Sequence, residues 1–198
     1  MQKIVKHFKR VDPILYQASQ KIHSLELLEK SENFFSDLCE AIINQQLSEK
    51  AGDTIFQRFT RLFPKGKISP EKLLLIPDGQ IRNVGPSNAK VTFLKDLATK
   101  VTQKELELDK LRELENDLVI KTLMKVKGIG PWTAEMFLMF SLAREDVFSF
   151  GDLGLQKAIQ KLYKLNKLPT KKQMGTISSK WSPYRTHAAL ILWRSLEV

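Results

Sequence analysis

The sequence predicts an all-α protein, and three observations carry that prediction. Apolar residues recur at helical spacing through most of the chain, as in Phe35, Leu38 and Ile42. Residues that commonly cap helices stand before these apolar runs, and glycine or proline separates them. No stretch alternates apolar and polar residues over the length of a strand. We therefore expect about ten helices and no sheet.

The expected helices are placed by their first residues. A candidate N-cap precedes each run, and in two cases proline follows at the first helical position, where a missing N–H costs least. These caps are Ser31, Ser48, Ser69 before Pro70, Ser87, Asp152, Thr170, and Ser182 before Pro183. Two further helices are expected near 119–126 and 131–142, while Asp78-Gly79 and Gly85-Pro86 are read as breaks.

Composition narrows the class of protein. The 198 residues suffice for one sizeable core or two small subdomains, and 32 Lys and Arg against 22 Asp and Glu leave a net charge of +10. Such a charge favours a polyanionic partner, of which nucleic acid is the commonest. The single cysteine, Cys39, excludes an internal disulfide and any four-cysteine metal site, and we expect it to be a buried small side chain.

No apolar run reaches the length of a membrane span, and the first residues lack the core of a signal peptide. The expected location is therefore the cytoplasm of a bacterium or archaeon, or a nucleus, and not the outside of the cell. No group of His, Cys and Asp has the spacing of metal ligands, so no catalytic metal is expected.

The most informative motif is Gly128-Ile129-Gly130-Pro131, followed directly by an apolar helical run. Two glycines around one apolar residue permit a tight turn whose backbone N–H groups can approach a phosphate closely. Pro131 suits the first turn of the next helix, and the helix N-terminus adds partial positive charge. By itself, a pair of glycines is a weak signal, and an ordinary turn between helices is the alternative.

Four further segments strengthen the motif, because together they resemble one family. The turn with Trp132, Thr133 and Ala134 resembles the hairpin of helix-hairpin-helix (HhH-GPD) DNA glycosylases, and Phe150-Gly151-Asp152 resembles their catalytic-aspartate loop. The segments 41–51 and 181–189 are similar to the AlkA-like 3-methyladenine branch of that superfamily, and 85–90 resembles a further segment of the family. In order and spacing, the resemblance runs from about residue 12 to residue 193.

The resemblance implies one glycosylase domain, 1–198, with two helical subdomains and an active-site cleft between them. The first would be a helical bundle of about 34–148 that includes the hairpin 126–134. The second would combine about 1–33 with 149–198. The extra N-terminal β domain of some relatives is not expected, because the helical pattern starts at once.

The implied catalytic residue is Asp152. Breaking an N-glycosidic bond develops positive charge on the deoxyribose, which a fixed carboxylate in a partly desolvated cleft can stabilise. Orienting or deprotonating the attacking water is a secondary role. Taken by itself, an aspartate before Leu153-Gly154 would be read as a helix N-cap. Trp132 stands where lyase-active relatives carry a nucleophilic lysine, so the resemblance implies base removal without strand cleavage.

The base pocket is expected to hold aromatic side chains that attract a cationic alkylated purine. By resemblance it would contain Trp132, Met136, Trp193 and Tyr184. Met136 departs from relatives that are aromatic there, which leaves the range of lesions open. We expect Trp181 to pack the last helix instead.

The expected DNA contacts fall into two groups. Phosphate contacts are assigned to Gly128, Gly130, Thr133, Lys127, Ser87, Lys90 and Arg185. Gln46 aligns with the wedge that fills the space left by the flipped nucleotide, and the neighbouring Gln45 and Leu47 belong to the same loop. The resemblance also adds a Na⁺ or K⁺ ion on the backbone carbonyls of Met124, Val126 and Ile129.

These features favour a monomeric, monofunctional glycosylase that flips alkylated bases out of double-stranded DNA, with no membrane partner. Two alternatives stay open: a uracil or thymine mismatch glycosylase of the same superfamily, and a protein that binds DNA structure without catalysis. The carboxylate Asp152 argues against the second alternative.

Overall fold

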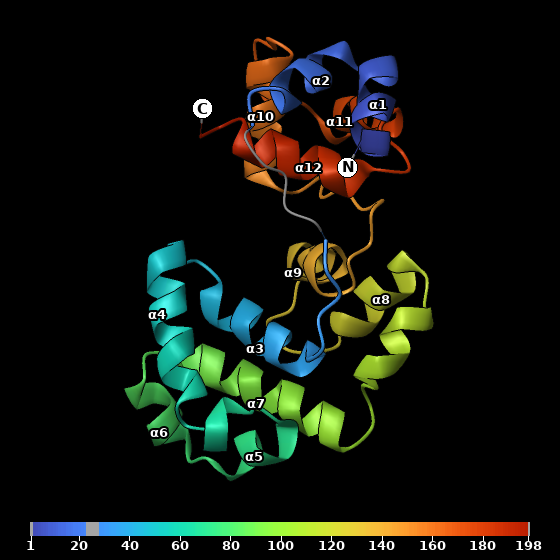
Figure 1. Cartoon of the computed structure of the whole chain (residues 1–198). Helices are drawn as coiled ribbons and strands as arrows, with labels where there is room; N and C mark the ends of the chain where they lie inside the picture. The colour runs from blue at the N-terminus through green and yellow to red at the C-terminus, as the bar shows by residue number, and fades with distance from the viewer. Residues whose placement is uncertain (1, 23–27, 198) are drawn as a thin grey trace. The chain divides into compact units, whose positions relative to one another are not determined.

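The computed structural model describes residues 2–22 and 28–197, and this part of the chain is helical without any strand (Figure 1). The all-α prediction is therefore confirmed. By its contacts the chain divides into two compact units. Unit 1 comprises Met1–Lys30 and Leu138–Val198, and unit 2 comprises Ser31–Phe137. Residues 138–148 thus belong to unit 1, although the sequence analysis assigns them to the central bundle.

Unit 1 contains five α-helices among its described residues: α1 (Gln2–Val11), α2 (Pro13–Ser19), α10 (Leu153–Leu162), α11 (Lys171–Ser179) and α12 (Arg185–Arg194). Unit 2 contains α3 (Phe34–Asn44), α4 (Glu49–Thr60), α5 (Pro70–Leu75), α6 (Asp78–Asn83), α7 (Asn88–Thr102), α8 (Asn116–Leu123) and α9 (Pro131–Met136). Short 3-10 turns lie at Pro64–Gly66 and Leu108–Glu113, and α9 runs into a π-helical turn, Phe137–Ser141. No described helix is long and apolar enough to cross a membrane.

Local capping chemistry explains most helix starts. Ser69, Ser87, Asp152 and Thr170 each accept a hydrogen bond from the backbone N–H three residues later, as predicted.

Four other local predictions were wrong or incomplete. Asn33 caps α3 in place of Ser31, and the Ser31 hydroxyl accepts from the Asn33 N–H instead. Ser48 stands at the N-cap of α4 but makes no side-chain capping bond. Tyr184, not Ser182, is the N-cap residue of α12. Asp78 begins α6 and is no break, because proline at 77 and an acid in the first turn favour a helix start.

A buried carboxylate, Asp12, organises unit 1. It caps α2 through Leu15 N–H, at 3.2 Å, and it is only 1% exposed. Its Oδ2 accepts from the Tyr163 hydroxyl, from Trp181 Nε1 at 2.7 Å, and from the Lys180 ammonium at 3.0 Å. Burial by itself would raise the pKa of Asp12, but these hydrogen bonds outweigh it and hold the pKa below its ordinary value. Trp181 is fully buried beside Phe148, which agrees with its expected packing role.

This network predicts a pH-dependent contribution to stability. Because folding lowers the pKa of Asp12, its stabilisation is present above the ordinary carboxyl pKa of about 4 and is lost as the pH falls through the lower folded value. Asp12→Asn should reduce the free energy of unfolding at pH 7 by about 1.5–3 kcal/mol, the usual range for hydrogen bonds to a charged group. Urea unfolding should show this difference shrinking below about pH 4. A difference that stays the same at pH 3 would contradict the assignment, and Asp109→Asn, on an exposed side chain, is the control.

Helix α7 is the central scaffold of unit 2, where Leu94 and Leu97 are fully buried in the core. The ammonium of Lys95 donates to three carbonyl oxygens at the end of α5, at distances of 2.6–3.2 Å. This cation therefore satisfies carbonyls that a helix end leaves without partners.

Cys39 is fully buried on α3 and burial raises the pKa of its thiol, so the expectation of a small buried side chain is confirmed.

Candidate functional site

The carboxylate of Asp152 is held by two donors within unit 1. Its Oδ1 accepts from Leu155 N–H at 2.7 Å, which caps α10, and from the indole Nε1 of Trp193 on α12 at 3.0 Å. Asp152 is 9% exposed. A Cβ at Gly154 would lie 3.0 Å from Asp152 Oδ1 and 3.1 Å from Trp193 Cδ1, so glycine there leaves room for the pair. Asp152 is therefore both the expected cap and a firmly oriented carboxylate.

Trp193 also takes part in an aromatic pair that sequence reasoning missed. Its ring lies 6.2 Å from that of Phe140, with 32° between the planes, and Phe140 is 46% exposed. Phe140 belongs to the π-helical turn, a conformation that is rare in helices and frequent at functional sites. The signal that could have found Phe140 is the i, i+4, i+8 spacing of Trp132, Met136 and Phe140, which places all three on one side of a helix.

Tyr184 does not join this group, which corrects its assignment to the base pocket. Tyr184 and Trp193 stand at opposite ends of α12, about 14 Å apart along the axis at 1.5 Å per residue. The Tyr184 ring is only 7% exposed and packs edge-on against His7 and His187. A single base therefore cannot use Tyr184 and Trp193 together as stacking partners.

The glycine turn lies in unit 2 between α8 and α9. Gly128 has a φ of +80°, and a Cβ there would come within 2.1 Å of the Phe93 ring on α7, so both conformation and space require glycine. Gly130 differs, because its φ is −97° and a Cβ there would meet no atom within 4 Å. Within the described part of the chain nothing requires glycine at 130, so the open space beside it can admit a ligand.

One backbone N–H group of the turn donates to another part of unit 2, and two others do not. Lys127 N–H donates to Asp96 Oδ2 on α7 at 2.9 Å, which anchors the turn to the scaffold helix. Neither Gly128 N–H nor Gly130 N–H donates to any residue in the described ranges. The Lys127 side chain is 66% exposed and its ammonium lies 3.9 Å from Asp96, a distance typical of a weak surface ion pair. Two unused N–H groups and an exposed ammonium are donors of the kind that can bind an anion.

Gln45 joins the loop after α3 to the glycine turn. Its Nε2 donates to the Gly128 carbonyl at 2.8 Å and to Thr133 Oγ1 at 3.3 Å. Thr133 is 4% exposed, so its hydroxyl is part of this internal network. The side chains of Gln45 and Thr133 thus position the turn, and the DNA contact assigned to these two residues stays a prediction.

Gln46 and Leu47 form the exposed tip of the same loop. Gln46 is exposed and has a φ of 58°, which is uncommon for a residue other than glycine and marks stored backbone strain. Leu47 is 38% exposed, and its N–H donates to the Asn44 carbonyl at 3.1 Å. An apolar side chain beside a polar one at a strained tip has the composition of a wedge that enters stacked bases.

Three residues assigned to phosphate have partners inside the protein. The Lys90 ammonium donates to the carbonyls of Ile43 and Gln45, both at 2.8 Å, and partial burial lowers the pKa of Lys90. Lys90 thus supports the loop 45–47 after α3, which we call the wedge loop. The Ser87 hydroxyl caps α7 by accepting from Lys90 N–H at 3.3 Å.

Arg185 is the third of these residues. Its Nε and Nη2 donate to the two carboxylate oxygens of Asp146, at 2.7 and 3.0 Å. Burial by itself would raise the pKa of Asp146, but hydrogen bonds from Arg185 and Ser182 outweigh it and lower that pKa. This fork geometry is that of a strong structural ion pair, so Arg185 fixes the start of α12.

The remaining predicted residues of the hairpin helix lie on α9 in unit 2. Trp132, at 46% exposure, follows Pro131 in the first turn, and Met136 is half-buried at the end of the helix. The structure therefore groups Asp152 and Trp193 with Phe140 in unit 1. It groups Gln45 and Thr133 with the glycine turn in unit 2.

The carbonyl groups expected to hold a cation lie on the glycine turn. Val126 O accepts from Ile129 N–H at 3.2 Å, whereas the carbonyls of Met124 and Ile129 have no hydrogen-bond donor in the described part of the chain. Two backbone oxygens with unused lone pairs are suitable ligands for a hard monovalent cation. Across residues 2–22 and 28–197, no group of three or more His, Cys, Asp or Glu side chains has a metal-binding arrangement.

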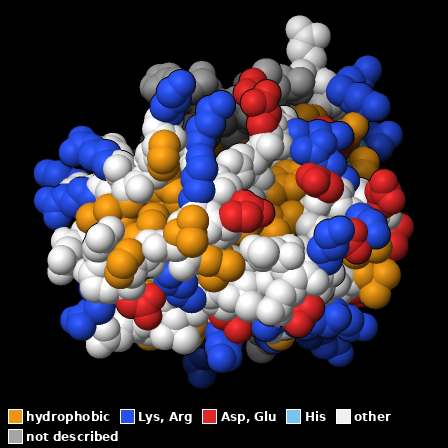
Figure 2. Space-filling view, turned by 90° about the horizontal axis from the view of Figure 1, so that it is seen from below, with side chains coloured by type: hydrophobic (Ala, Val, Ile, Leu, Met, Phe, Trp, Pro, Cys, Tyr) orange, Lys and Arg blue, Asp and Glu red, His pale blue; other side chains and the backbone are white. Residues whose placement is uncertain are grey.

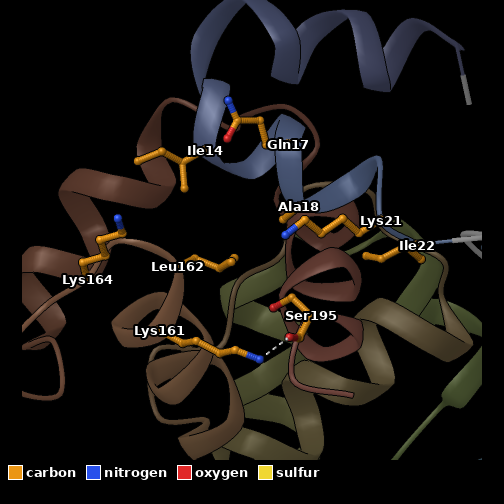
Figure 3. Close-up of a pocket in the computed structure, with 9 residues that line it drawn as sticks. All are labelled: Ile14, Gln17, Ala18, Lys21, Ile22, Lys161, Leu162, Lys164 and Ser195. Atoms are coloured by element: carbon orange, nitrogen blue, oxygen red, sulfur yellow. Dashed lines mark hydrogen bonds between the residues drawn. The ribbon is translucent and has the colours of Figure 1, made fainter. Parts of the chain in front are cut away.

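A hollow of about 410 Å³ in unit 1 lies where α2 meets α10 (Figure 3). It combines apolar side chains such as Leu162 with Lys21, Lys161 and Lys164, and Lys161 donates to the Ser195 carbonyl at 3.1 Å. None of the predicted site residues lines it. The Asp152 group therefore does not line this hollow.

Comparison with known proteins assigns the chain to a family. Residues 39–183 match the model of the HhH-GPD superfamily of base excision DNA repair proteins. The chain is 30% identical over its whole length to a putative DNA-3-methyladenine glycosylase of Bacillus subtilis, covering 70% of that protein. It is 35% identical to DNA-3-methyladenine glycosylase 1 of Schizosaccharomyces pombe, over 85% of this chain and 74% of the relative.

Solved structures agree with the sequence relatives. The Schizosaccharomyces pombe 3-methyladenine DNA glycosylase, solved with abasic DNA, has a TM-score of 0.89 at 30% identity, covering 99% of this chain and 97% of that one. A DNA-3-methyladenine glycosidase of Bacillus halodurans has a TM-score of 0.84 at 36% identity, covering 96% and 88%. The chain therefore belongs to the HhH-GPD superfamily of base excision DNA repair proteins, in its 3-methyladenine glycosylase branch.

Proposed function

We propose that this chain is a monomeric, monofunctional DNA glycosylase that hydrolyses the N-glycosidic bond of alkylated bases in double-stranded DNA. The observation that carries the proposal is the carboxylate of Asp152, 9% exposed and oriented by Leu155 N–H and Trp193 Nε1. The names of the relatives, which are 3-methyladenine glycosylases, support the same substrate class.

The proposed reaction breaks the bond between C1′ of deoxyribose and the base nitrogen. The electron pair leaves with the base, and positive charge develops on the sugar. The Asp152 carboxylate stabilises this charge, because it is fixed and largely removed from water. Water then adds to C1′ and loses its proton to Asp152 or solvent, which leaves an abasic site and a free base. An alkylated purine is cationic and already a good leaving group, so no general acid is needed.

The aromatic pair of half-buried Trp193 and exposed Phe140 supports recognition of that cationic base. An aromatic face attracts a positive charge through its quadrupole, which separates an alkylated base from a normal one without a detailed hydrogen-bond code. Trp132 supports monofunctional chemistry, since an indole cannot form the Schiff base that precedes strand cleavage.

DNA binding in this proposal uses the glycine turn and the wedge loop. A phosphate would accept from Gly128 N–H and Gly130 N–H, with the Lys127 ammonium nearby. A Na⁺ or K⁺ ion on the carbonyls of Met124, Val126 and Ile129 would add positive charge to the same turn. Gln46 and Leu47 would fill the space left by the flipped nucleotide, offsetting an unstacking cost of a few kcal/mol.

The test is a release assay on duplex DNA treated with a methylating agent. We expect chromatography to show free 3-methyladenine, and a denaturing gel to show an intact strand until alkali or heat is applied. Parallel duplexes with G·U and G·T pairs test the mismatch alternative. Release of uracil or thymine without any alkylated base would reject the proposed substrate. Binding without any release would indicate a non-catalytic protein, and a nick without alkali or heat would reject monofunctional chemistry.

A further inference from the structure

The first helix, α1, carries four cations and no acid. Lys3, Lys6 and Arg10 follow one another at helical spacing, and Lys9 lies over the Tyr16 ring at 5.7 Å. None of the four forms a salt bridge with a residue in the described ranges. Other lysines of the chain, such as Lys95, do have an acidic partner. The charge on α1 is therefore not compensated within the described protein.

Three of these cations, Lys3, Lys6 and Arg10, line a concave surface, which we call the α1 hollow. It has a volume of about 540 Å³ and is lined by Lys3, Lys6, His7, Arg10, Ser182, Pro183 and Tyr184. Its wall is rigid, because His7 packs edge-on against Tyr184 at 5.3 Å and its Nε2 is hydrogen bonded to the Lys180 carbonyl at 3.2 Å. Like charges held around one hollow repel each other unless an anion lies among them.

The acid next to this hollow does not neutralise it. Asp146 accepts from the Ser182 hydroxyl at 2.8 Å, but both of its carboxylate oxygens also accept from Arg185. Its charge is thus matched by Arg185. The α1 cations remain available to an outside ligand.

The net charge of the chain and the nature of its other lysine-lined hollow favour DNA as that ligand. Lys90 and Arg185, which were expected to bind DNA, form hydrogen bonds inside the protein instead. The chain nevertheless carries a net charge of +10, so other cations are left to bind a polyanion. Figure 2 shows exposed Lys and Arg side chains around the edge of one face of the molecule, with hydrophobic side chains gathered between them. The lysine hollow of Figure 3 is partly apolar and its Lys161 is bonded internally, so it suits a polyanion less well.

We propose that the α1 hollow is a second phosphate-binding site, separate from the glycine turn, that takes the sugar-phosphate backbone of DNA. This rests on the proposed function for the identity of the polymer. Lys3 and Arg10 lie about 10 Å apart along the helix axis, which matches about three nucleotides of one strand at 3.4 Å each. Arg10 supplies a fork for one phosphate, while the lysines act as point charges on its neighbours.

The test compares two triple variants of equal charge. K3Q/K6Q/R10Q removes the α1 cations, and the control K157Q/K171Q/K172Q removes three exposed lysines elsewhere in unit 1. Fluorescence anisotropy should measure affinity for an undamaged duplex over a range of salt concentrations. We expect the α1 variant to lower the slope of log K against log salt by about 2 to 3, at about 0.9 per lost phosphate contact, and the control by less than about 1. The conservative variant K3R/K6R/R10K should retain the slope.

Three outcomes would overturn the proposal. Equal slopes for the two glutamine triples would mean that the α1 cations are an ordinary solvated surface. Calorimetry that shows inorganic phosphate or pyrophosphate binding as tightly as DNA would indicate a site for a small anion. An unchanged slope in the α1 variant with normal thermal unfolding would exclude phosphate contact at α1. Base release by the wild-type protein is scored separately, so failure of the proposed function is recognised by the absence of released base.

Discussion

Asp152→Asn is expected to slow base release by about 10²- to 10³-fold while leaving the fold intact. Asparagine is as good an N-cap as aspartate, so Leu155 N–H and Trp193 Nε1 keep an oxygen acceptor and α10 keeps its start. What disappears is the negative charge that stabilises the cationic sugar. Losing one preorganised electrostatic group of this kind typically costs about 10²- to 10³-fold in rate.

The measurement is single-turnover release of 3-methyladenine, together with thermal unfolding and DNA affinity. Asp109→Asn makes the same change of charge on an exposed side chain, so it should keep the wild-type rate. If Asp152→Asn retained more than about a tenth of the rate with normal stability, Asp152 would be only a helix cap, and the proposed mechanism would be wrong.

Gly128→Ala and Gly130→Ala are expected to have opposite consequences, although both lie in one turn. At Gly128 a methyl group meets the Phe93 ring at 2.1–2.5 Å and the φ of +80° strains any residue with a Cβ. Strain and overpacking together should lower the free energy of unfolding by about 2–5 kcal/mol. At Gly130 the backbone is extended and the space is open, so alanine should leave the fold unchanged or stabilise it by about 0.4–1 kcal/mol.

Urea unfolding and DNA affinity, measured on both variants, separate the two roles. Weaker DNA binding by the stable Gly130→Ala variant would show that a phosphate approaches the turn at this position. Wild-type affinity for Gly130→Ala would remove the open space from the binding surface. Wild-type stability for Gly128→Ala would show that Phe93 moves away at little cost.

The helices and their starts were largely predictable, because capping and helical periodicity act over three or four residues. Asp152 shows this well, since its capping bond to Leu155 spans three residues. Where two capping residues stood close together, as Ser31 and Asn33 do, the sequence did not discriminate between them. The side chain that completes the cap is selected by the path of the preceding segment.

The partners of the charged residues were not predictable, since they come from distant parts of the chain. Lys90 binds carbonyls 45 and 47 residues away, and Arg185 pairs with an acid 39 residues away. A sequence shows a cation next to a motif, but it does not show whether a helix end or an acid will pack against that cation. For this reason, Lys90 and Arg185, which the sequence assigns to phosphate, have structural partners inside the protein.

The sequence by itself determined the helical class, the glycine turn, the lone acid at 152 and the missing lysine at 132, because each depends on residue type and local spacing. Only the tertiary structure decided which groups share a site. In the structure, Trp193 Nε1 donates to Asp152, which is 41 residues away in the sequence, and the Trp193 ring packs against Phe140. Tyr184 lies at the other end of α12 from Trp193. Packing determines these contacts, and packing depends on the shape of the whole core, which no local pattern encodes.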